Sequence, residues 1–187
     1  MSSPSAFDDD PNLGRVIVGA EELQERVAAL GKEITADFAG RPPLLVCVLK
    51  GAFLFMADLA RSIDLPVEVD FMAVSSYGAA TRTSGVVRIV KDLDLDLQGR
   101  DVLLVEDIVD SGLTLRYLRQ NLEARNPASL EVCALLVRES AGEAASDLRY
   151  VGFSIPDDFI VGYGLDVAER YRSLPYLCAW EGPSDTR

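Results

Sequence analysis

The stretch Val102–Leu115, with the sequence VLLVEDIVDSGLTL, decides the expected fold. Its apolar first half is typical of a strand that is buried on both faces of a parallel sheet. Two carboxylates, Glu106 and Asp107, follow this run directly, and the residues from Asp110 to Thr114 (DSGLT) then open a helix. The stretch therefore predicts a strand, a polar turn and a helix, with the polar residues at the carboxyl end of the strand, where open α/β sheets bind ligands.

The residue types in this turn indicate a site for a sugar phosphate. Backbone N–H groups at the start of a helix can hold a phosphate without lysine, and Gly112 lets the backbone approach closely. Ser111 and Thr114 add hydroxyl donors. Adjacent buried carboxylates need partners, and ribose hydroxyls or Mg²⁺ suit Glu106 and Asp107. Any one of these residues could simply cap the helix, but the complete string favours a ribose-phosphate site, since the P-loop and dinucleotide spacings are absent.

Helices and strands alternate along the rest of the chain. Apolar residues at helical spacing predict an amphipathic helix over residues 20–38, and continuous apolar runs predict buried strands. Strands are expected at residues 44–49, 66–74, 86–91, 101–105 and 130–137, with weaker signals at 149–153 and 159–165, and further helices at 51–63 and 114–124. A polar loop is expected after the strand at 130–137. This alternation predicts an α/β fold with a mostly parallel, twisted sheet flanked by helices. We expect residues 1–12 to be a disordered tail and residues 13–187 a single domain.

Composition disfavours several classes of protein. The chain has 187 residues, a formal net charge of −12 and no histidine. The negative charge disfavours nucleic acids and anionic membranes as partners, and the lack of histidine removes Ser-His-Asp catalysis and the commonest zinc ligand. Cys47, Cys133 and Cys178 are widely spaced and odd in number, so we expect buried free thiols in a reducing compartment. With no signal peptide and no membrane-spanning apolar run, the expected location is the cytoplasm.

The motif VLLVEDIVDSGLTL resembles the one with which type I phosphoribosyltransferases bind phosphoribosyl pyrophosphate (PRPP). Three further segments make the chain similar to the hypoxanthine-guanine phosphoribosyltransferases over roughly residues 15–180: LKG at 49–51, SSYG at 75–78, and FIVGYGLD at 159–166 followed by Arg172. The resemblance implies a type I phosphoribosyltransferase fold with a small hood, formed by the terminal segments, over the base site. It implies transfer of the 5-phosphoribosyl group from PRPP to N9 of hypoxanthine or guanine, Mg²⁺ as cofactor, and a homodimer or homotetramer.

The same resemblance implies a role for each matching residue. The 5′-phosphate would bind at Asp110, Ser111, Gly112, Leu113 and Thr114, and the ribose at Glu106 and Asp107. Pyrophosphate would bind at Lys50, Gly51 and Arg172, with a cis peptide bond before Lys50. The purine would contact Ile108, Arg138, Phe159, Ile160 and Asp166. Mg²⁺ would lie near Glu106, Asp107 and Asp166. Ser76 and Tyr77 would belong to a lid in the loop over residues 75–85, and Asp110 is the expected general base.

One position departs from the family. Where the family has a lysine that donates to the 6-oxo group of the purine, this chain has Arg138. Arginine keeps the charge and the donors, but its guanidinium is larger, planar and forked. The preference among hypoxanthine, guanine and xanthine therefore stays open, and so does the possibility that Arg138 points away from the base.

Three other functions also stay open. A related phosphoribosyltransferase for xanthine, adenine or a pyrimidine would share the PRPP motif. A signalling receiver domain has paired acids at strand ends, but it needs an aspartate at the end of its central strand, and the strand expected at 66–74 is followed by Ser75. A nucleotide-sensing, RNA-binding regulator on the same fold is disfavoured by the net charge of −12.

Overall fold

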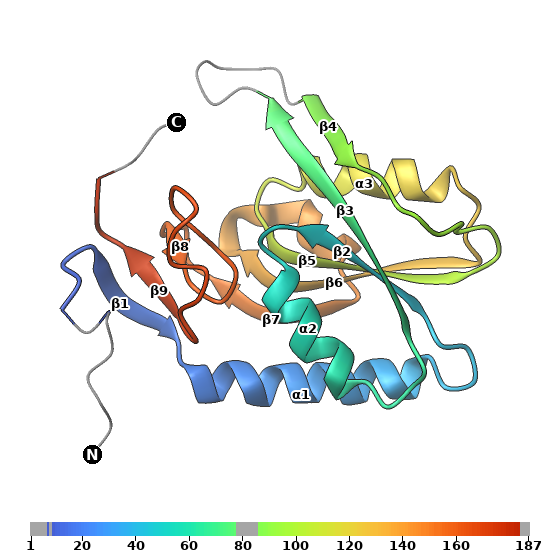
Figure 1. The fold of residues 1–187 in the computed structure, drawn as a ribbon, viewed down its shortest axis with the longest axis horizontal. Coiled ribbons are helices and arrows are strands. Elements are labelled where there is room, and N and C mark those ends of the chain that lie inside the picture. Colours follow the sequence, from blue (N-terminus) through green and yellow to red (C-terminus); the bar gives the residue numbers. More distant parts are fainter. Residues whose placement is uncertain (1–6, 8, 78–85, 184–187) are drawn as a thin grey trace.

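The computed structural model describes residue 7, residues 9–77 and residues 86–183. Its centre is a six-stranded sheet with the strand order β4-β3-β2-β5-β6-β7 (Figure 1). The strands are β2 (Leu44–Leu49), β3 (Glu68–Tyr77), β4 (Val86–Lys91), β5 (Asp101–Val109), β6 (Ser129–Arg138) and β7 (Tyr150–Ile155). Strand β4 pairs antiparallel with β3, and the other pairs in the sheet are parallel. The predicted mostly parallel sheet is confirmed.

The strand order reverses between β2 and β5. From β2 the chain passes through a helix to β3 on one side, and from β5 it passes through another helix to β6 on the opposite side. The segments that leave the carboxyl ends of β2 and β5 therefore diverge. This is the position at which open α/β sheets form their binding crevice.

Helices cover both faces of the sheet (Figure 1). They are α1 (Ala20–Asp37), α2 (Phe53–Ser62) and α3 (Leu113–Glu123), with a 3-10 segment η1 (Glu139–Asp147) after β6. Alternate residues of a strand point to opposite faces. In β2, Leu45 and Cys47 join the core beneath α1 and α2, whereas Leu44 and Val46 join the core beneath α3. This two-sided burial explains why the strand is a continuous apolar run.

A second, three-stranded sheet brings together segments from the two ends of the chain. Its order is β1-β9-β8, and its strands are β1 (Leu13–Val18), β9 (Leu177–Trp180) and β8 (Ile160–Val161). Within the segment expected to be a tail, the carboxylate of Asp10 accepts a hydrogen bond from the hydroxyl of Tyr171 at 2.8 Å. The carbonyl of Asn12 accepts one from the backbone N–H of Glu181 at 2.8 Å.

Strand β5 is longer than predicted. It does not end before Glu106 and Asp107 but continues to Val109, because its parallel pairing with β6 continues past them. The two acids therefore lie inside the last part of a strand. Their backbone is fixed by the sheet.

Two further predictions need correction. The loop expected over residues 75–85 begins later, since Ser75, Ser76 and Tyr77 still belong to β3 and pair with β4. Residues 78–85 lie outside the described residues. The segment after β6, expected to be a loop, forms η1.

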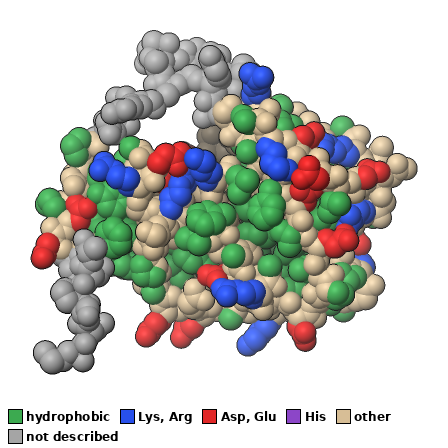
Figure 2. All heavy atoms as spheres, viewed as in Figure 1, with side chains coloured by type: hydrophobic (Ala, Val, Ile, Leu, Met, Phe, Trp, Pro, Cys, Tyr) green, Lys and Arg blue, Asp and Glu red, His purple; other side chains and the backbone are tan. Residues whose placement is uncertain are grey.

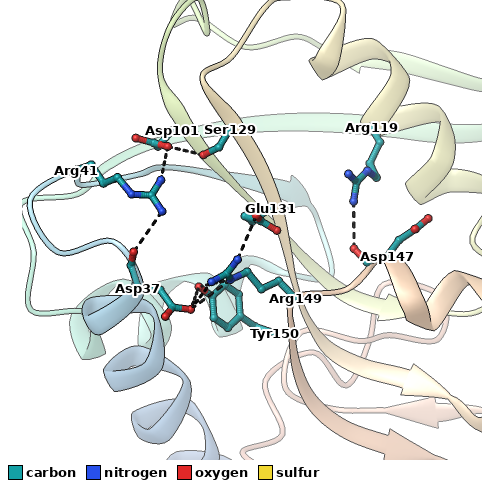
Figure 3. A network of polar contacts seen from close by, with 9 residues as sticks. All are labelled: Asp37, Arg41, Asp101, Arg119, Ser129, Glu131, Asp147, Arg149 and Tyr150. Atoms are coloured by element: carbon teal, nitrogen blue, oxygen red, sulfur yellow. Dashed lines mark hydrogen bonds and ion pairs between the residues drawn. The ribbon is translucent and has the colours of Figure 1, made fainter.

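A polar network ties together the amino ends of the strands, at the edge of the sheet opposite the crevice (Figure 3). The carboxylate of Asp37, at the end of α1, accepts hydrogen bonds from the hydroxyl of Tyr150 at 2.8 Å and from Arg149 at 2.9 Å. These contacts lower the pKa of the Asp37 carboxyl. Arg149 also pairs with Glu131 on β6 at 3.4 Å. The network joins α1 to the starts of β6 and β7.

The three cysteines are buried and unpaired, as predicted. Burial raises the pKa of the Cys47 thiol to about 12, so it remains protonated and inert near neutral pH. Among the helices of the described residues, none is both long and apolar enough to cross a membrane.

Candidate active site

A pocket of about 250 Å³ opens at the carboxyl ends of β2 and β5. Residues 48–51 and Val74 form one part of its wall, and all residues from Glu106 to Leu115 form the rest. The second part of the motif that decided the fold, from Glu106 to Leu115, thus faces one space. Lys50 and Gly51, which are distant in sequence, face it as well.

The turn before α3 supplies free backbone donors. Gly112 has a φ of 74°, a left-handed conformation that suits glycine, and a Cβ at this position would overlap Ala144 of η1. No described side chain caps α3, so a capping role does not explain the polar residues of the turn. The first helical bond is donated by the N–H of Arg116 to the carbonyl of Gly112 at 2.9 Å. The N–H groups from Leu113 to Leu115 therefore lack helical acceptors and can bind an anion.

Two acids lie deep in the pocket, and burial raises the pKa of both. Burial, reinforced by the charge of Asp107, raises the pKa of Glu106 well above its usual range. Burial raises the pKa of Asp107 to about 6, although the N–H of Ile108 donates to its carboxylate at 2.7 Å and Arg172 lies near enough to oppose the rise. Buried carboxyls with raised pKa values are stabilised by a bound cation or hydroxyl donor.

Gly51 packs directly against Asp107. A Cβ on Gly51 would overlap the carboxylate of Asp107, and a Cβ on Gly164 would overlap the carbonyl of Gly51. Glycine at position 164 therefore avoids a backbone clash, and glycine at position 51 leaves the carboxylate of Asp107 in its place. The peptide bond between Leu49 and Lys50 is cis, as the resemblance implied. Segments that follow β2 and β8 meet the end of β5 at this point.

Lys50 and Arg172 line a wide hollow of about 610 Å³ beside the pocket. The carboxylate of Glu169 bridges them, at 3.0 Å from Nζ of Lys50 and 3.0 Å from Nη2 of Arg172. Arg172 also donates to the carbonyl of Gly164 at 2.8 Å and pairs with Asp166 at 2.8 Å. Its Nε is buried and has no acceptor among the described residues. Buried donors are normally paired, so this atom suits an acceptor on a ligand.

Arg138, at the end of β6, is turned toward backbone carbonyls. Its Nη1 donates to the carbonyl of Pro156 at 3.1 Å and to that of Asp158 at 2.8 Å. Its Nε lies 3.7 Å from the carboxylate of Asp110. Phe159 follows this turn, and its side chain is 55% exposed. An exposed aromatic ring thus follows a turn that Arg138 connects to Asp110, beside the start of α3.

Comparison with known proteins agrees with this geometry. The family model described as phosphoribosyl transferase domain matches residues 19–168. The chain belongs to the phosphoribosyltransferase family. It is 57% identical over 172 residues to the hypoxanthine-guanine phosphoribosyltransferase of Mycobacterium avium, covering 89% of this chain and 85% of that protein. It is 49% identical over 166 residues to the enzyme of the same name from Bacillus subtilis, with 89% and 92% covered.

Solved structures of phosphoribosyltransferases share the fold. A hypoxanthine phosphoribosyltransferase from Staphylococcus aureus superposes with a TM-score of 0.85 at 41% identity, covering 90% of this chain and 92% of that chain. A hypoxanthine-guanine phosphoribosyltransferase from L. donovani gives a TM-score of 0.84 at 39% identity, covering 91% and 98%. The type I phosphoribosyltransferase fold implied by the resemblance is confirmed.

The structure places the remaining predicted site residues as follows. Ile108 lines the pocket, whereas the side chain of Ile160 is buried in the core. Both carboxylate oxygens of Asp166 are engaged, one by Arg172 and the other by the N–H of Glu169. Ser76 and Tyr77 end β3, and their side chains are outside the described part of the chain.

Two residues of this site were not predicted from the sequence. Gly164 belongs to a Gly-Tyr-Gly sequence that is too short to indicate a phosphate loop, and its role is to admit the carbonyl of Gly51. Glu169 lies between the predicted residues Asp166 and Arg172. An additional acid within a segment expected to bind pyrophosphate was a signal that could have identified it.

Glu106 and Asp107 suit the Mg²⁺ that the family implies. Mg²⁺ usually takes one or two carboxylates together with water and substrate oxygens. Neither acid forms an ion pair with a described residue, and burial raises the pKa values of both. No group of three or more acidic or cysteine side chains suited to a metal exists among the described residues. The donor set therefore fits an ion that completes its coordination with the substrate.

Proposed function

We propose that this protein transfers the 5-phosphoribosyl group from PRPP to N9 of hypoxanthine or guanine, giving IMP or GMP and pyrophosphate. The observation that carries the proposal is the turn at Gly112. It directs free N–H groups of α3 into a pocket that also contains the paired acids Glu106 and Asp107. Relatives with 49–57% identity carry the name hypoxanthine-guanine phosphoribosyltransferase.

The reaction exchanges one bond at the anomeric carbon for another. The bond to the pyrophosphate oxygen breaks as the purine nitrogen attacks from the opposite face, and positive charge develops on the ribose ring. The 5′-phosphate would lie on the loop from Asp110 to Thr114, and Glu106 and Asp107 would hold the ribose hydroxyls. Fixing both reactants in line lowers the entropic part of the barrier, and the two carboxylates stabilise the growing positive charge.

The proton of the purine imidazole ring needs an acceptor during the attack. Asp110 is our candidate general base, because it lies in the phosphate loop and its carboxylate is 3.7 Å from Nε of Arg138 on the base side. The exposed ring of Phe159 would stack on the purine, the backbone of Ile160 would read its edge, and Ile108 would pack beside it.

The leaving pyrophosphate needs positive partners. Lys50 and Arg172 would bind it, with the backbone of Gly51 against Asp107. Mg²⁺ bound with the substrate at Glu106 and Asp107 would neutralise part of the pyrophosphate charge. Asp166 would act on the ion through water, since its own oxygens are engaged in the protein. Ser76 and Tyr77 would begin a lid that excludes water from the reacting carbon.

We also propose a homodimer or homotetramer in the cytoplasm. Figure 2 shows hydrophobic side chains gathered in the middle of the face on which α2 and β3 lie. The rings of Phe53 and Phe71 are 39% and 38% exposed and line the hollow beside Lys50, which supports association through this face. The net charge of −12 favours small-molecule partners over nucleic acids or membranes. Sedimentation velocity tests the assembly.

A panel of bases with PRPP and Mg²⁺ tests the reaction. Hypoxanthine and guanine should yield nucleotide and pyrophosphate, whereas adenine and uracil should not. Turnover of adenine or uracil alone would refute the assignment. Xanthine is the second candidate substrate. The Nη1 of Arg138 donates to backbone carbonyls, so the side chain that would donate to the 6-oxo group in the family has a different orientation in this protein.

A further inference from the structure

Glu169 holds together the two cations assigned to pyrophosphate. One carboxylate oxygen lies 3.0 Å from Nζ of Lys50 and the other 3.0 Å from Nη2 of Arg172. The side chains of Lys50 and Glu169 are each 64% exposed, so the bridge stands at the open side of the site. A phosphate oxygen that binds both cations must take the place that this carboxylate holds.

The backbone that presents Glu169 is unfavourable for its residue type. Val167 and Arg170 exchange both backbone hydrogen bonds, at 3.2 and 3.0 Å. The two residues between them, Ala168 and Glu169, have φ values of 49° and 64°. A two-residue turn with positive φ at both positions favours glycine, asparagine or aspartate. Glutamate gains nothing from this conformation, and residues held in such a conformation are concentrated at functional sites.

Arg172 would keep a partner if Glu169 moved away. Asp166 pairs with Arg172 at 2.8 Å through one oxygen, and its second oxygen accepts the N–H of Glu169 at 2.8 Å. The guanidinium therefore stays oriented by Asp166 and by the carbonyl of Gly164. The buried Nε of Arg172 has no acceptor among the described residues, and Glu169 does not accept from it either. The side chain of Glu169 can leave without the cation losing its position.

We propose that Glu169 is an internal counter-anion that occupies Lys50 and Arg172 in the free protein and is displaced when the pyrophosphate group of PRPP binds. This inference rests on the proposed function. It gives Glu169 a definite effect on the reaction, because each pyrophosphate or PRPP molecule must compete with a carboxylate that is already in place. Glu169 thereby weakens the binding of PRPP and speeds the release of pyrophosphate, while the base side of the site is unaffected.

Two substitutions at Glu169 test the proposal. Glu169→Gln removes the charge and keeps the size of the side chain. Glu169→Gly removes the carboxylate and also suits the positive φ. Calorimetric titration with magnesium pyrophosphate, and separately with PRPP in magnesium buffer, should show binding about two- to tenfold tighter in both variants, the range expected for losing exposed ion pairs. The Michaelis constant for PRPP should fall by a similar factor, and that for the purine should not change.

The glycine variant also tests whether the turn at Glu169 is strained. Glu169→Gly should raise the midpoint of thermal unfolding by about 2–4 °C, because the turn loses a non-glycine residue from a left-handed position. The matched control is Glu25→Gln, on the exposed face of α1. It makes the same change in net charge and should alter neither pyrophosphate binding nor the purine constant.

The outcomes separate this inference from the proposed function. Weaker or unchanged pyrophosphate binding in both variants would overturn the counter-anion role and show that Glu169 supports Lys50 instead. A wild-type protein that binds neither PRPP nor pyrophosphate would refute the proposed function itself. Tighter binding by the same factor in Glu25→Gln would assign the effect to net charge and would also overturn the proposal.

Discussion

The Nη1 atom of Arg138 lies 2.8 Å from the carbonyl oxygen of Asp158, the residue before Phe159. A second hydrogen bond, to the carbonyl of Pro156 at 3.1 Å, completes a clamp on the turn that carries the exposed ring. Both bonds are donated by Nη1, which is held at the end of a rigid planar guanidinium, whereas lysine carries its single ammonium group on a flexible stem. Arginine at this position therefore fixes the geometry of the base side in addition to supplying charge.

We expect Arg138→Lys to loosen this turn. A lost hydrogen bond to a charged donor is worth about 1.5–3 kcal/mol, so kcat/KM for hypoxanthine should fall about tenfold or more. The ratios among hypoxanthine, guanine and xanthine should shift as well. Steady-state kinetics with the three bases measures this. Arg61→Lys, on the exposed surface of α2, is the control, and unchanged constants for all three bases in Arg138→Lys would contradict the clamp.

Asp110→Asn tests the general base. Loss of a positioned base lowers turnover by about 10²–10⁴-fold. The fold and the affinity for PRPP should remain, because asparagine keeps the shape of the side chain and the proposed phosphate contacts are mainly with backbone N–H groups. Single-turnover kinetics, calorimetry and thermal unfolding separate the three effects. Asp64→Asn, an exposed position outside the site, serves as control, and wild-type turnover in Asp110→Asn would exclude the role.

Gly51→Ala should disable the site without unfolding the protein. The added Cβ would overlap the carboxylate of Asp107, so the strand end or the acid must shift. Displacements of about 1 Å in reacting groups lower rates by about 10²-fold. Gly19→Ala is the matched control, because nothing lies within 4 Å of a Cβ there. Equal activities of the two variants would show that this close approach is not needed.

The acids Glu106 and Asp107 should make the ligand-free protein less stable as the pH rises. Burial raises the pKa of Asp107 from 3.8 to about 6 and that of Glu106 well above 4.5. Between the ordinary and the raised values the native state holds protons that the unfolded chain has lost. The free energy of unfolding therefore falls with increasing pH over that range.

Glu106→Gln removes one of these acids. We expect it to increase the free energy of unfolding at pH 8 by on the order of 1–3 kcal/mol and to lower activity. The gain should shrink as the pH falls below the ordinary values of 4.5 and 3.8, where both carboxyls become protonated in the unfolded state as well. Urea unfolding at several pH values in EDTA measures it. A variant less stable than wild type at pH 8 would show that the ionised acid has a partner in the native protein.

Elements with a strong local signal could be predicted from the sequence. Strand β2 has the predicted bounds because six apolar residues lie between Pro43 and Lys50. The predicted end of β5 was wrong. Two acidic residues indicate the end of a strand only as long as the pairing with the neighbouring strand β6 is unknown. Strand β1 was missed because glycine and arginine interrupt its apolar pattern and its partner β9 lies at the far end of the chain.

The candidate site divides in the same way. The motif around Gly112 could be recognised because its residues are consecutive, and they line one pocket. The orientation of Arg138 and the bridge made by Glu169 could not be predicted, because each depends on side chains or carbonyls brought together from separate segments. Local sequence identifies which groups are present, whereas tertiary packing decides which of them face one another.

The polar network in Figure 3 bears on how such a molecule can acquire new preferences. Through Asp37, Arg149 and Tyr150, the network holds together the edge of the sheet that lies opposite the binding crevice. These stabilising contacts therefore lie at a distance from the turns that would meet the base. An exchange at the opposite edge, such as arginine for lysine at the end of β6, would then change the choice of base without weakening the contacts that hold the sheet together.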